Sequence, residues 1–404
     1  MKKKEAPDIY LAPTNILFLF ILGGLMALTS LSTDIYLPAL PHMDVELQGN
    51  IELTITGFLI GFAVAQIFWG PISDRIGRKK PLVIGLILFI IGSICCALSH
   101  TITEIIIARV IQAFGACVGP MLSRAMVRDL FGRAKAAEML STLMIIMALA
   151  PIVGPLLGGQ ILRLSSWHSI FWLLAIIGVV MLISFKQLPE TLPKEKRLQT
   201  SVWKAFREYR LLLRNTRFML YTLCVTFFYV GVYAFIAGSP AVYINYFHVQ
   251  PQHYGWLFSL NIVGVMGISF VNRLLIRKYT LDLILKVSTT IAMLGGLTLL
   301  MLVKLNLGGI YGVVIPIFFF FAMNGVIAAT STAAALDLVP EMAGSASALL
   351  GALQYGSGII STIILSWLNN DTGNPWNMSW IMALFACLCA LTIWIKTLAK
   401  KTRG

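Results

Sequence analysis

Charged residues are scarce in this chain. They make up 12% of its 404 residues, whereas hydrophobic residues make up 58%. A water-soluble domain carries roughly 25% charged residues. Acidic residues are especially few, with 17 Asp and Glu against 31 Lys and Arg. One water-facing globule cannot bury so much apolar surface, so the composition excludes a soluble domain and predicts a membrane protein.

Cysteine and the common catalytic signatures are also scarce or missing. The six cysteines all fall inside predicted helices, and none has the CxxC spacing of a metal or redox site. The chain has no HExxH, GxSxG or phosphate-binding loop. We therefore expect no cofactor, no metal site and no ATP-driven step. A membrane-embedded enzyme is disfavoured because no paired carboxylates fall at membrane depth.

Long apolar segments dominate the chain. A helix needs about 20 apolar residues to cross a hydrocarbon core about 30 Å thick. Lipid cannot satisfy free backbone polar groups, so these spans must be helical. The sequence therefore predicts an all-α membrane protein with twelve spans: 16–40, 51–71, 81–99, 103–127, 138–162, 169–186, 218–243, 254–274, 282–303, 310–333, 342–367 and 377–396.

The formal net charge of +14 suggests a nucleic-acid partner, but its distribution argues against one. With twelve spans, 28 of the 31 Lys and Arg residues fall on one side; only Arg163 and Lys304 fall on the other, and Arg109 lies within a span. Positive loops face the cytoplasm in membrane proteins. We therefore expect both termini in the cytoplasm and no nucleic-acid partner.

A long polar stretch divides the spans into two sets of six. It covers residues 187–217, is basic, and separates an N-terminal bundle (1–186) from a C-terminal bundle (218–404). An internal repeat supports this division, because residues 272–278 align with residues 74–80 at an offset of 198, and the arginine and the following cations are retained. The expected architecture is two pseudo-symmetric six-helix halves.

Several motifs resemble one transporter family. The charged turn GPISDRIGRKK (70–80), RVIQAFGA (109–116) and GPLLGG (154–159) are similar to motifs of the major facilitator superfamily. Ala113 departs from the glycine that is common in the second motif. STDIYLPALP (32–41), SWHSIFW (166–172) and LPETL (188–192) resemble the bicyclomycin/chloramphenicol resistance subgroup of drug/proton antiporters.

The resemblance implies a bacterial inner-membrane protein that works as a monomer. It would export small amphipathic drugs or metabolites in exchange for protons, by alternating access across the lipid bilayer. A dedicated metabolite or siderophore transporter of the same fold, exporting or importing, is the alternative. The resemblance does not identify the cargo.

Asp34 and Arg109 are the two ionisable residues that fall clearly within the outer halves of the predicted spans, away from the span ends. Both lie about 9 Å below the outer surface, at about 1.5 Å per residue. Charges at this depth usually face a partner or a water-filled cavity. We expect Asp34 to carry the coupling proton and Arg109 to tune it. The alternative is that Asp34 only pins the helix end near Pro38.

Other polar groups within the spans are candidates for the substrate cavity. Gln112 lies one turn from Arg109 in the fourth predicted span. Each candidate could instead be an ordinary hydrogen-bond partner between helices. The set is Gln112, Tyr229, Tyr233, Asn261, Asn324 and Gln354.

The charged turn after the second span is expected to gate the cytoplasmic side. Asp74 would contact the positive N-terminus of the eleventh helix near residue 342, and ion pairs to Arg124 or Arg128 would add to this latch. Alternatively, the cations only enforce orientation. The residues assigned to the latch are Gly70, Asp74, Arg75, Gly77, Arg78, Arg124 and Arg128.

Small residues in the fifth predicted span form the motif associated with antiporters. Gly154, Gly158 and Gly159 would let neighbouring helices approach closely, and Pro155 would bend the helix. Ordinary small-residue packing is the alternative.

Overall fold

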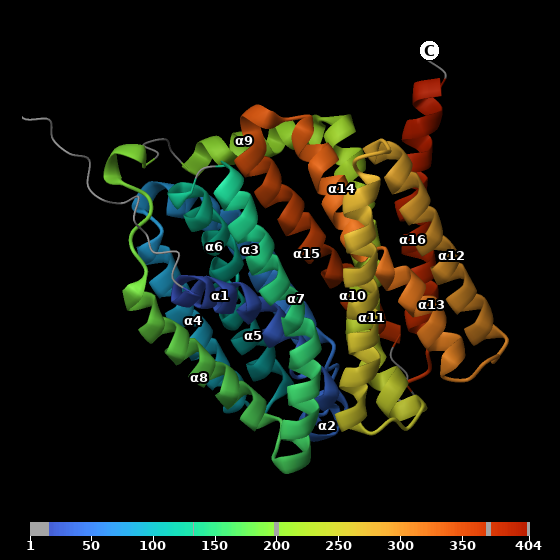
Figure 1. Ribbon diagram of the computed structural model, residues 1–404. Helices are drawn as coiled ribbons and strands as arrows, with labels where there is room; N and C mark the ends of the chain where they lie inside the picture. The colour runs from blue at the N-terminus through green and yellow to red at the C-terminus, as the bar shows by residue number, and fades with distance from the viewer. Residues whose placement is uncertain (1–15, 132, 198–201, 369–372, 402–404) are drawn as a thin grey trace, which may run out of the picture.

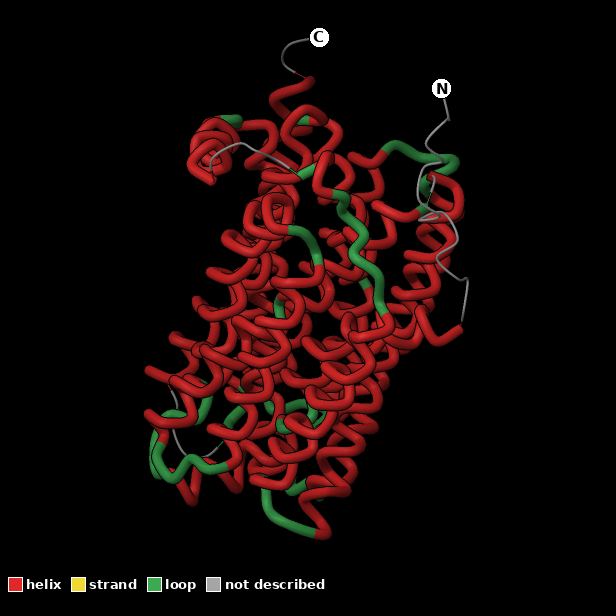
Figure 2. The backbone as a smooth tube through the Cα atoms, turned by 90° about the vertical axis from the view of Figure 1, so that its left-hand side faces the viewer, coloured by secondary structure: helices red, strands yellow, loops and turns green. Residues whose placement is uncertain are grey.

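The computed structural model describes residues 16–131, 133–197, 202–368 and 373–401. Helices and the loops between them account for these residues (Figure 2). The main helices are α1 (Ile16–Asp34), α2 (Leu40–Leu47), α3 (Leu53–Ile76), α4 (Lys79–Ala97), α5 (Ile102–Ala116), α6 (Val118–Leu130), α7 (Arg133–Leu164), α8 (His168–Ser184), α9 (Val202–Arg214), α10 (Thr216–Pro240), α11 (Pro251–Leu275), α12 (Leu281–Lys304), α13 (Tyr311–Ala322), α14 (Asn324–Asp337), α15 (Ala343–Leu368) and α16 (Trp376–Lys401).

The twelve predicted spans are confirmed. Within the described ranges, twelve helical stretches are long and apolar enough to cross a membrane. Their bounds agree with the predicted ones to within a few residues at most ends. The first and second spans run farthest beyond their predicted ends, to Leu47 and Ile76.

The first span is broken, which the sequence analysis did not anticipate. The α-helix ends at Asp34, a short 3-10 helix η2 (Leu37–Ala39) follows, and α2 then begins. Pro38 and Pro41 have no backbone N–H and cannot continue the hydrogen-bond ladder of α1. Asp34 therefore lies at a helix end rather than inside a continuous helix.

The helices pack as two sets of six spans. Helices α1–α8 contact one another on the left of Figure 1, and α10–α16 contact one another on the right. The most extensive contacts between the halves are those of α3 with α15 and of α7 with α11. The short helix η2 also contacts α10 and α11, and α2 contacts the π-helical segment after α10. Helix α9 also touches both halves, through α3 on one side and α10 and α15 on the other.

The two ends of the molecule differ in charge. We call the end that carries α9 and the turn between α11 and α12 the basic face; it lies at the top of Figure 1. We call the other end, which carries α2 and the segment between α10 and α11, the opposite face.

The halves are packed together at the opposite face. The Thr56 hydroxyl of α3 donates a hydrogen bond to the Thr362 hydroxyl of α15 over 2.7 Å. A Cβ atom added at Gly159 of α7 would meet the carbonyl oxygen of Pro251 at the start of α11. Toward the basic face, Gly70 of α3 and Gly344 of α15 have open space where a Cβ would be. The contact between α3 and α15 is therefore tight from the opposite face as far as Gln66 and Gly351, and it opens beyond them toward the basic face.

Candidate functional site

Arg109 is fully buried at the centre of the N-terminal half. Helix α5 begins with a capping box formed by Thr101 and Glu104, which fixes the start of the helix seven residues before this arginine. One guanidinium nitrogen, Nη1, donates to the Ser32 carbonyl oxygen over 2.9 Å and to the Gln112 side-chain oxygen over 2.6 Å. The bond to Ser32 ties α5 to the end of α1.

Two aromatic rings cover the same guanidinium. The centroids of Tyr36 and Phe58 each lie 4.4 Å from its central carbon. Cation–π attraction is worth about 2 kcal/mol or more when the cation is desolvated. Among the described residues, the buried Nε and Nη2 atoms of Arg109 have no hydrogen-bond partner. This edge of the cation therefore keeps donors that the bonds to Ser32 and Gln112 do not use.

Asp34 lies at the end of α1 and is 5% exposed. The Thr33 hydroxyl donates to its Oδ1 atom over 3.0 Å. Arg109 lies within electrostatic range of this carboxyl group, but no ion pair within 4.0 Å joins the two among the described residues. The two predicted coupling residues are thus neighbours that do not form an ion pair in this state.

Tyrosines of the C-terminal half face the same carboxyl group. Tyr233 of α10, Tyr254 of α11 and Tyr355 of α15 all lie within electrostatic range of Asp34. The Phe62 ring of α3 packs against the Tyr355 ring in a tilted arrangement, with centroids 4.5 Å apart. The site is therefore built from both halves. The sequence analysis named Tyr233 but missed Tyr254 and Tyr355, although each is a tyrosine within a predicted span.

The remaining cavity candidates divide into those that join this cluster and those that do not. Gln112 binds Arg109 and also donates to the Ser93 hydroxyl over 2.8 Å. Tyr229 and Tyr233 have ring centroids 6.2 Å apart, and Gln354 lies within hydrogen-bonding reach of Tyr229. Their role in substrate binding stays a prediction.

Two asparagines are placed differently. Asn261 is buried, and its amide nitrogen donates to the Leu257 carbonyl oxygen of its own helix over 3.3 Å. Its Oδ1 atom is buried and has no hydrogen-bond partner. Asn324 is half-buried and begins α14, directly after the break in the tenth span. Neither has a described contact with Arg109 or Asp34.

A second charged cluster surrounds Arg78 at the basic face. Its guanidinium donates to Asp74 over 2.6 Å, to Ser73 over 2.9 Å and to Asp129 of α6 over 2.9 Å. Although burial alone would lower the pKa of Arg78, its bonds to Asp129 and Asp74 raise it, so the side chain stays cationic. Asp129 was missed by the sequence analysis, which considered only cations near the end of this helix.

Glu190 joins the polar linker to this cluster. Its two carboxylate oxygens accept hydrogen bonds from the backbone N–H groups of Arg78 and Lys79, over 2.9 and 3.1 Å. These two N–H groups have no partner within the helix because they lie at the start of α4, where a negative charge is favourable. The neighbouring Thr191 hydroxyl donates to Asp129 over 3.1 Å. Glu190 therefore caps α4 from outside the helix.

Gly77 makes this cap possible. Its φ is +97°, a conformation that side chains rarely adopt, and an added Cβ would press against Glu190. The backbone therefore turns tightly at Gly77. Gly70, another residue assigned to the latch, borders open space.

The partners predicted for Asp74 differ from those observed. Asp74 bonds to Arg78, and Arg124 donates to the Pro120 carbonyl oxygen of its own helix over 2.8 Å. Asp74 has no described ion pair to Arg124 or Arg128. Its contact with the start of α15 stays a prediction, for a state in which the halves meet at the basic face.

Replacing Glu190 with Gln is expected to lower the free energy of unfolding by about 1–2 kcal/mol, because one charge-assisted capping interaction is lost. Thermal unfolding of the purified protein in detergent measures this loss. Glu195→Gln is the matched control, because Glu195 is an exposed acid of the same segment. Equal melting temperatures for the two variants would contradict the capping role.

The glycines of α7 pack against the end of α1 and against α11. A Cβ at Gly158 would collide with the Ile35 carbonyl oxygen, next to Asp34. A Cβ at Gly154 would come no closer than 3.3 Å to the same segment. The motif thus packs α7 against the backbone beside Asp34 and against the other half.

Gly158→Ala is expected to displace the Ile35 backbone or α7, reducing transport and lowering the melting temperature by several degrees. Gly154→Ala is the matched control and is expected to change both by far less, because its Cβ would lie 3.3 Å from the Ile35 backbone nitrogen and needs a shift of only a few tenths of an ångström. Measuring melting and transport for both variants tests the packing. Similar melting temperatures and transport rates for the two variants would contradict this packing role of Gly158.

Comparisons with known proteins agree with this fold. The family model described as Major Facilitator Superfamily matches residues 22–362. The uncharacterized MFS-type transporter YdgK of Bacillus subtilis is 37% identical, over 92% of this chain and 93% of that protein. The bicyclomycin resistance protein homolog of Haemophilus influenzae is 30% identical, over 90% of this chain and 92% of that protein.

A solved structure shows the same architecture. The xylose transporter XylE from E. coli superposes with a TM-score of 0.74 and 16% identity, covering 94% of this chain and 96% of that one. At this identity the likeness concerns the fold alone. Together with the family match, the twelve spans and the two six-helix halves, it shows that this chain belongs to the Major Facilitator Superfamily, a family of transporters rather than enzymes.

Proposed function

We propose that this protein is a proton-coupled antiporter that exports small amphipathic drugs or metabolites across the bacterial inner membrane. The observation that carries the proposal is the buried carboxyl group of Asp34, which lies beside Arg109 and faces tyrosines of the other half. The similarity to a bicyclomycin resistance protein homolog supports drugs as the cargo class.

The coupling step at this site is a change of partner for the Asp34 carboxyl group, in which the guanidinium of Arg109 replaces a bound proton. Burial disfavours the ionised form of an acid, so Asp34 holds a proton while the site is dry. Arg109 keeps one guanidinium edge without a hydrogen-bond partner. If substrate entry or helix movement brings this edge to Asp34, the ion pair stabilises the carboxylate and the proton leaves.

The cavity groups suit an amphipathic cargo. Phe62, Tyr233 and Tyr355 offer apolar ring faces, and the two tyrosines add hydroxyl groups. A single carboxyl group beside a buried cation favours neutral or weakly anionic molecules over dications. A monomer is sufficient, because both halves of the site come from one chain.

The orientation follows from the charge distribution. We assign the basic face to the cytoplasm, since positive loops are retained there. The halves are packed at the opposite face, so this structure corresponds to a state closed toward the outside. Opening at the opposite face and closing at the basic face would complete the cycle.

Drug accumulation in bacteria lacking their own efflux pumps tests this function. Cells that express the protein are expected to accumulate several-fold less chloramphenicol or bicyclomycin than cells with an empty vector. A protonophore is expected to remove the difference. Equal accumulation for a panel of amphipathic antibiotics would contradict drug export and favour a dedicated metabolite transporter.

A further inference from the structure

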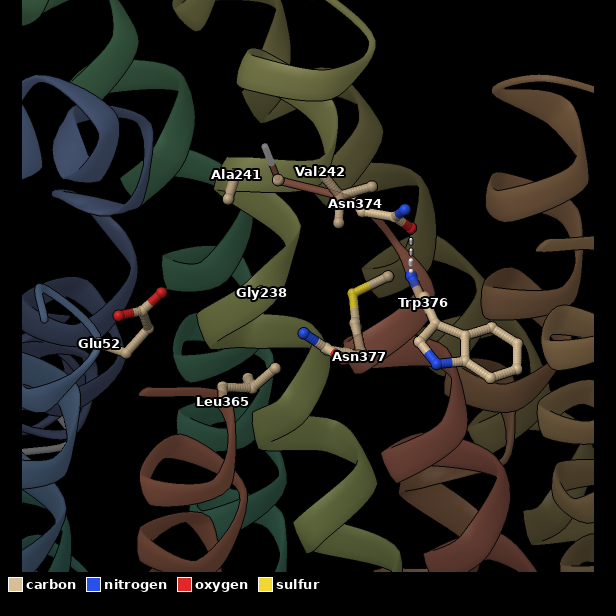
Figure 3. A pocket seen from close by; sticks show the side chains of 10 residues that line it. Glu52, Gly238, Ala241, Val242, Leu365, Asn374, Trp376 and Asn377 are labelled. Carbon is tan, nitrogen blue, oxygen red and sulfur yellow. Dashed lines mark hydrogen bonds between the residues drawn. The ribbon is translucent and has the colours of Figure 1, made fainter. Parts of the chain in front are cut away.

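A cavity of about 110 Å³ lies between the two halves near the opposite face. Figure 3 shows Glu52, at the start of α3, facing side chains of the C-terminal half across this space. The other lining residues are uncharged: Gly238, Ala241, Val242, Leu365, Gly373, Asn374, Trp376, Asn377 and Met378. Glu52 was not singled out by the sequence analysis, because it lies at the boundary of a predicted span.

Glu52 is buried because the halves meet here. Its exposed fraction is 6%. A smaller adjoining cavity is also lined by Glu52, together with Asp44 of the N-terminal half and Ala237, Pro240 and Asn245 of the C-terminal half. Among the residues that line the two cavities, Asp44 is the other ionisable group, and it carries the same sign of charge.

These surroundings favour the protonated acid. Burial is the main effect that raises the pKa of Glu52 to about 7; a hydrogen bond to its own backbone opposes this rise, and the charge of Asp44 adds to it. Separation of the halves at this face would expose Glu52 to water, where the ordinary pKa is 4.5. The closed arrangement therefore binds the proton more tightly than an open one.

We propose that Glu52 is a proton-binding residue of the gate at the opposite face, which closes when the Glu52 carboxylate has taken up a proton and opens when the carboxylic acid gives it up. The proton comes from water on this side and returns to it. Protonation of Glu52 therefore controls closure of the gate. It does not add to the protons that Asp34 carries across the membrane. The proposal rests on the proposed alternating-access function.

The direction of the pH effect follows from linkage. A group that binds protons more tightly in the closed state favours that state at low pH, and this preference fades as the pH rises past about 7. Between about pH 5.5 and about pH 8, the ratio of closed to open molecules is expected to fall about tenfold or more.

Distances between two spin labels across this gate measure the ratio. Val45 of α2 and Tyr246 of the π-helical segment Ala241–Tyr246 are exposed and lie on different halves. Both would be replaced by labelled cysteines in a chain whose native cysteines are changed to alanine. Raising the pH in detergent, with the same buffer on both faces, is expected to increase the population with the longer distance.

Two variants separate Glu52 from other titrating groups. Glu52→Gln keeps the shape of the protonated acid and is expected to hold the gate closed at every pH. Asp44→Asn removes the neighbouring negative charge, lowers the pKa of Glu52 and is expected to move the midpoint to lower pH. The proposal would be overturned by a distance distribution that does not change with pH. It would also be overturned if Glu52→Gln kept the pH response of the chain that has Glu52.

This readout is independent of proton-coupled transport. Loss of the pH response in Glu52→Gln supports the gate even if no substrate evokes proton movement. Conversely, an unchanged pH response alongside substrate-evoked proton release would refute the role of Glu52 and leave the proposed antiport standing.

Discussion

Replacing Asp34 with Asn is expected to abolish proton release evoked by substrate, a loss of at least about a hundredfold. The amide cannot exchange a proton, but it keeps the shape of the side chain and can still accept the Thr33 hydrogen bond. Purified protein in liposomes with a trapped pH-sensitive dye measures the loss.

Exchange of labelled for unlabelled substrate is the control for this variant. It needs no net proton movement, so Asp34→Asn is expected to retain it within a fewfold, which shows that the protein is folded and still binds. Undiminished proton release in Asp34→Asn would mean that another group carries the proton, and would leave Asp34 as a residue that only pins the end of α1.

Arg109→Lys is expected to reduce transport at least about tenfold although the charge is kept. An ammonium group has no planar face to lie between the rings of Tyr36 and Phe58. It also cannot keep the hydrogen bonds to Ser32 and Gln112 in the same geometry and offer a second pair of donors to Asp34. The loss of about 1.4 kcal/mol or more corresponds to this tenfold change.

Arg163→Lys is the matched control, because Arg163 is exposed near the end of α7. It is expected to transport as the unmodified chain does. Initial rates of substrate uptake in liposomes compare the two. Equal rates for Arg109→Lys and Arg163→Lys would show that position 109 requires only a positive charge.

The spans and the central pair could be predicted because lipid imposes simple rules. Apolar length fixes where helices cross, and charges at membrane depth are rare enough that Asp34 and Arg109 stand out. The helix end at Asp34 was missed because spans were marked by hydropathy, which continues through Pro38. Pro38 and Pro41, which cannot continue the helix, were visible in the sequence.

The contacts between distant segments could not be predicted. Glu190 lies in the polar linker, where an acid is ordinary, and only folding brings it to the start of α4. The burial of Glu52 likewise depends on which face is closed. The sequence is the same in every state of the cycle, so it does not specify one state.

Substrate-driven proton movement tests the central claim most directly. The protein would be placed in liposomes with a trapped pH-sensitive dye, and amphipathic antibiotics would be added one at a time under an imposed pH gradient. The account predicts that at least one compound evokes proton release and that Asp34→Asn removes it. Transport of a compound without any proton movement would contradict the account.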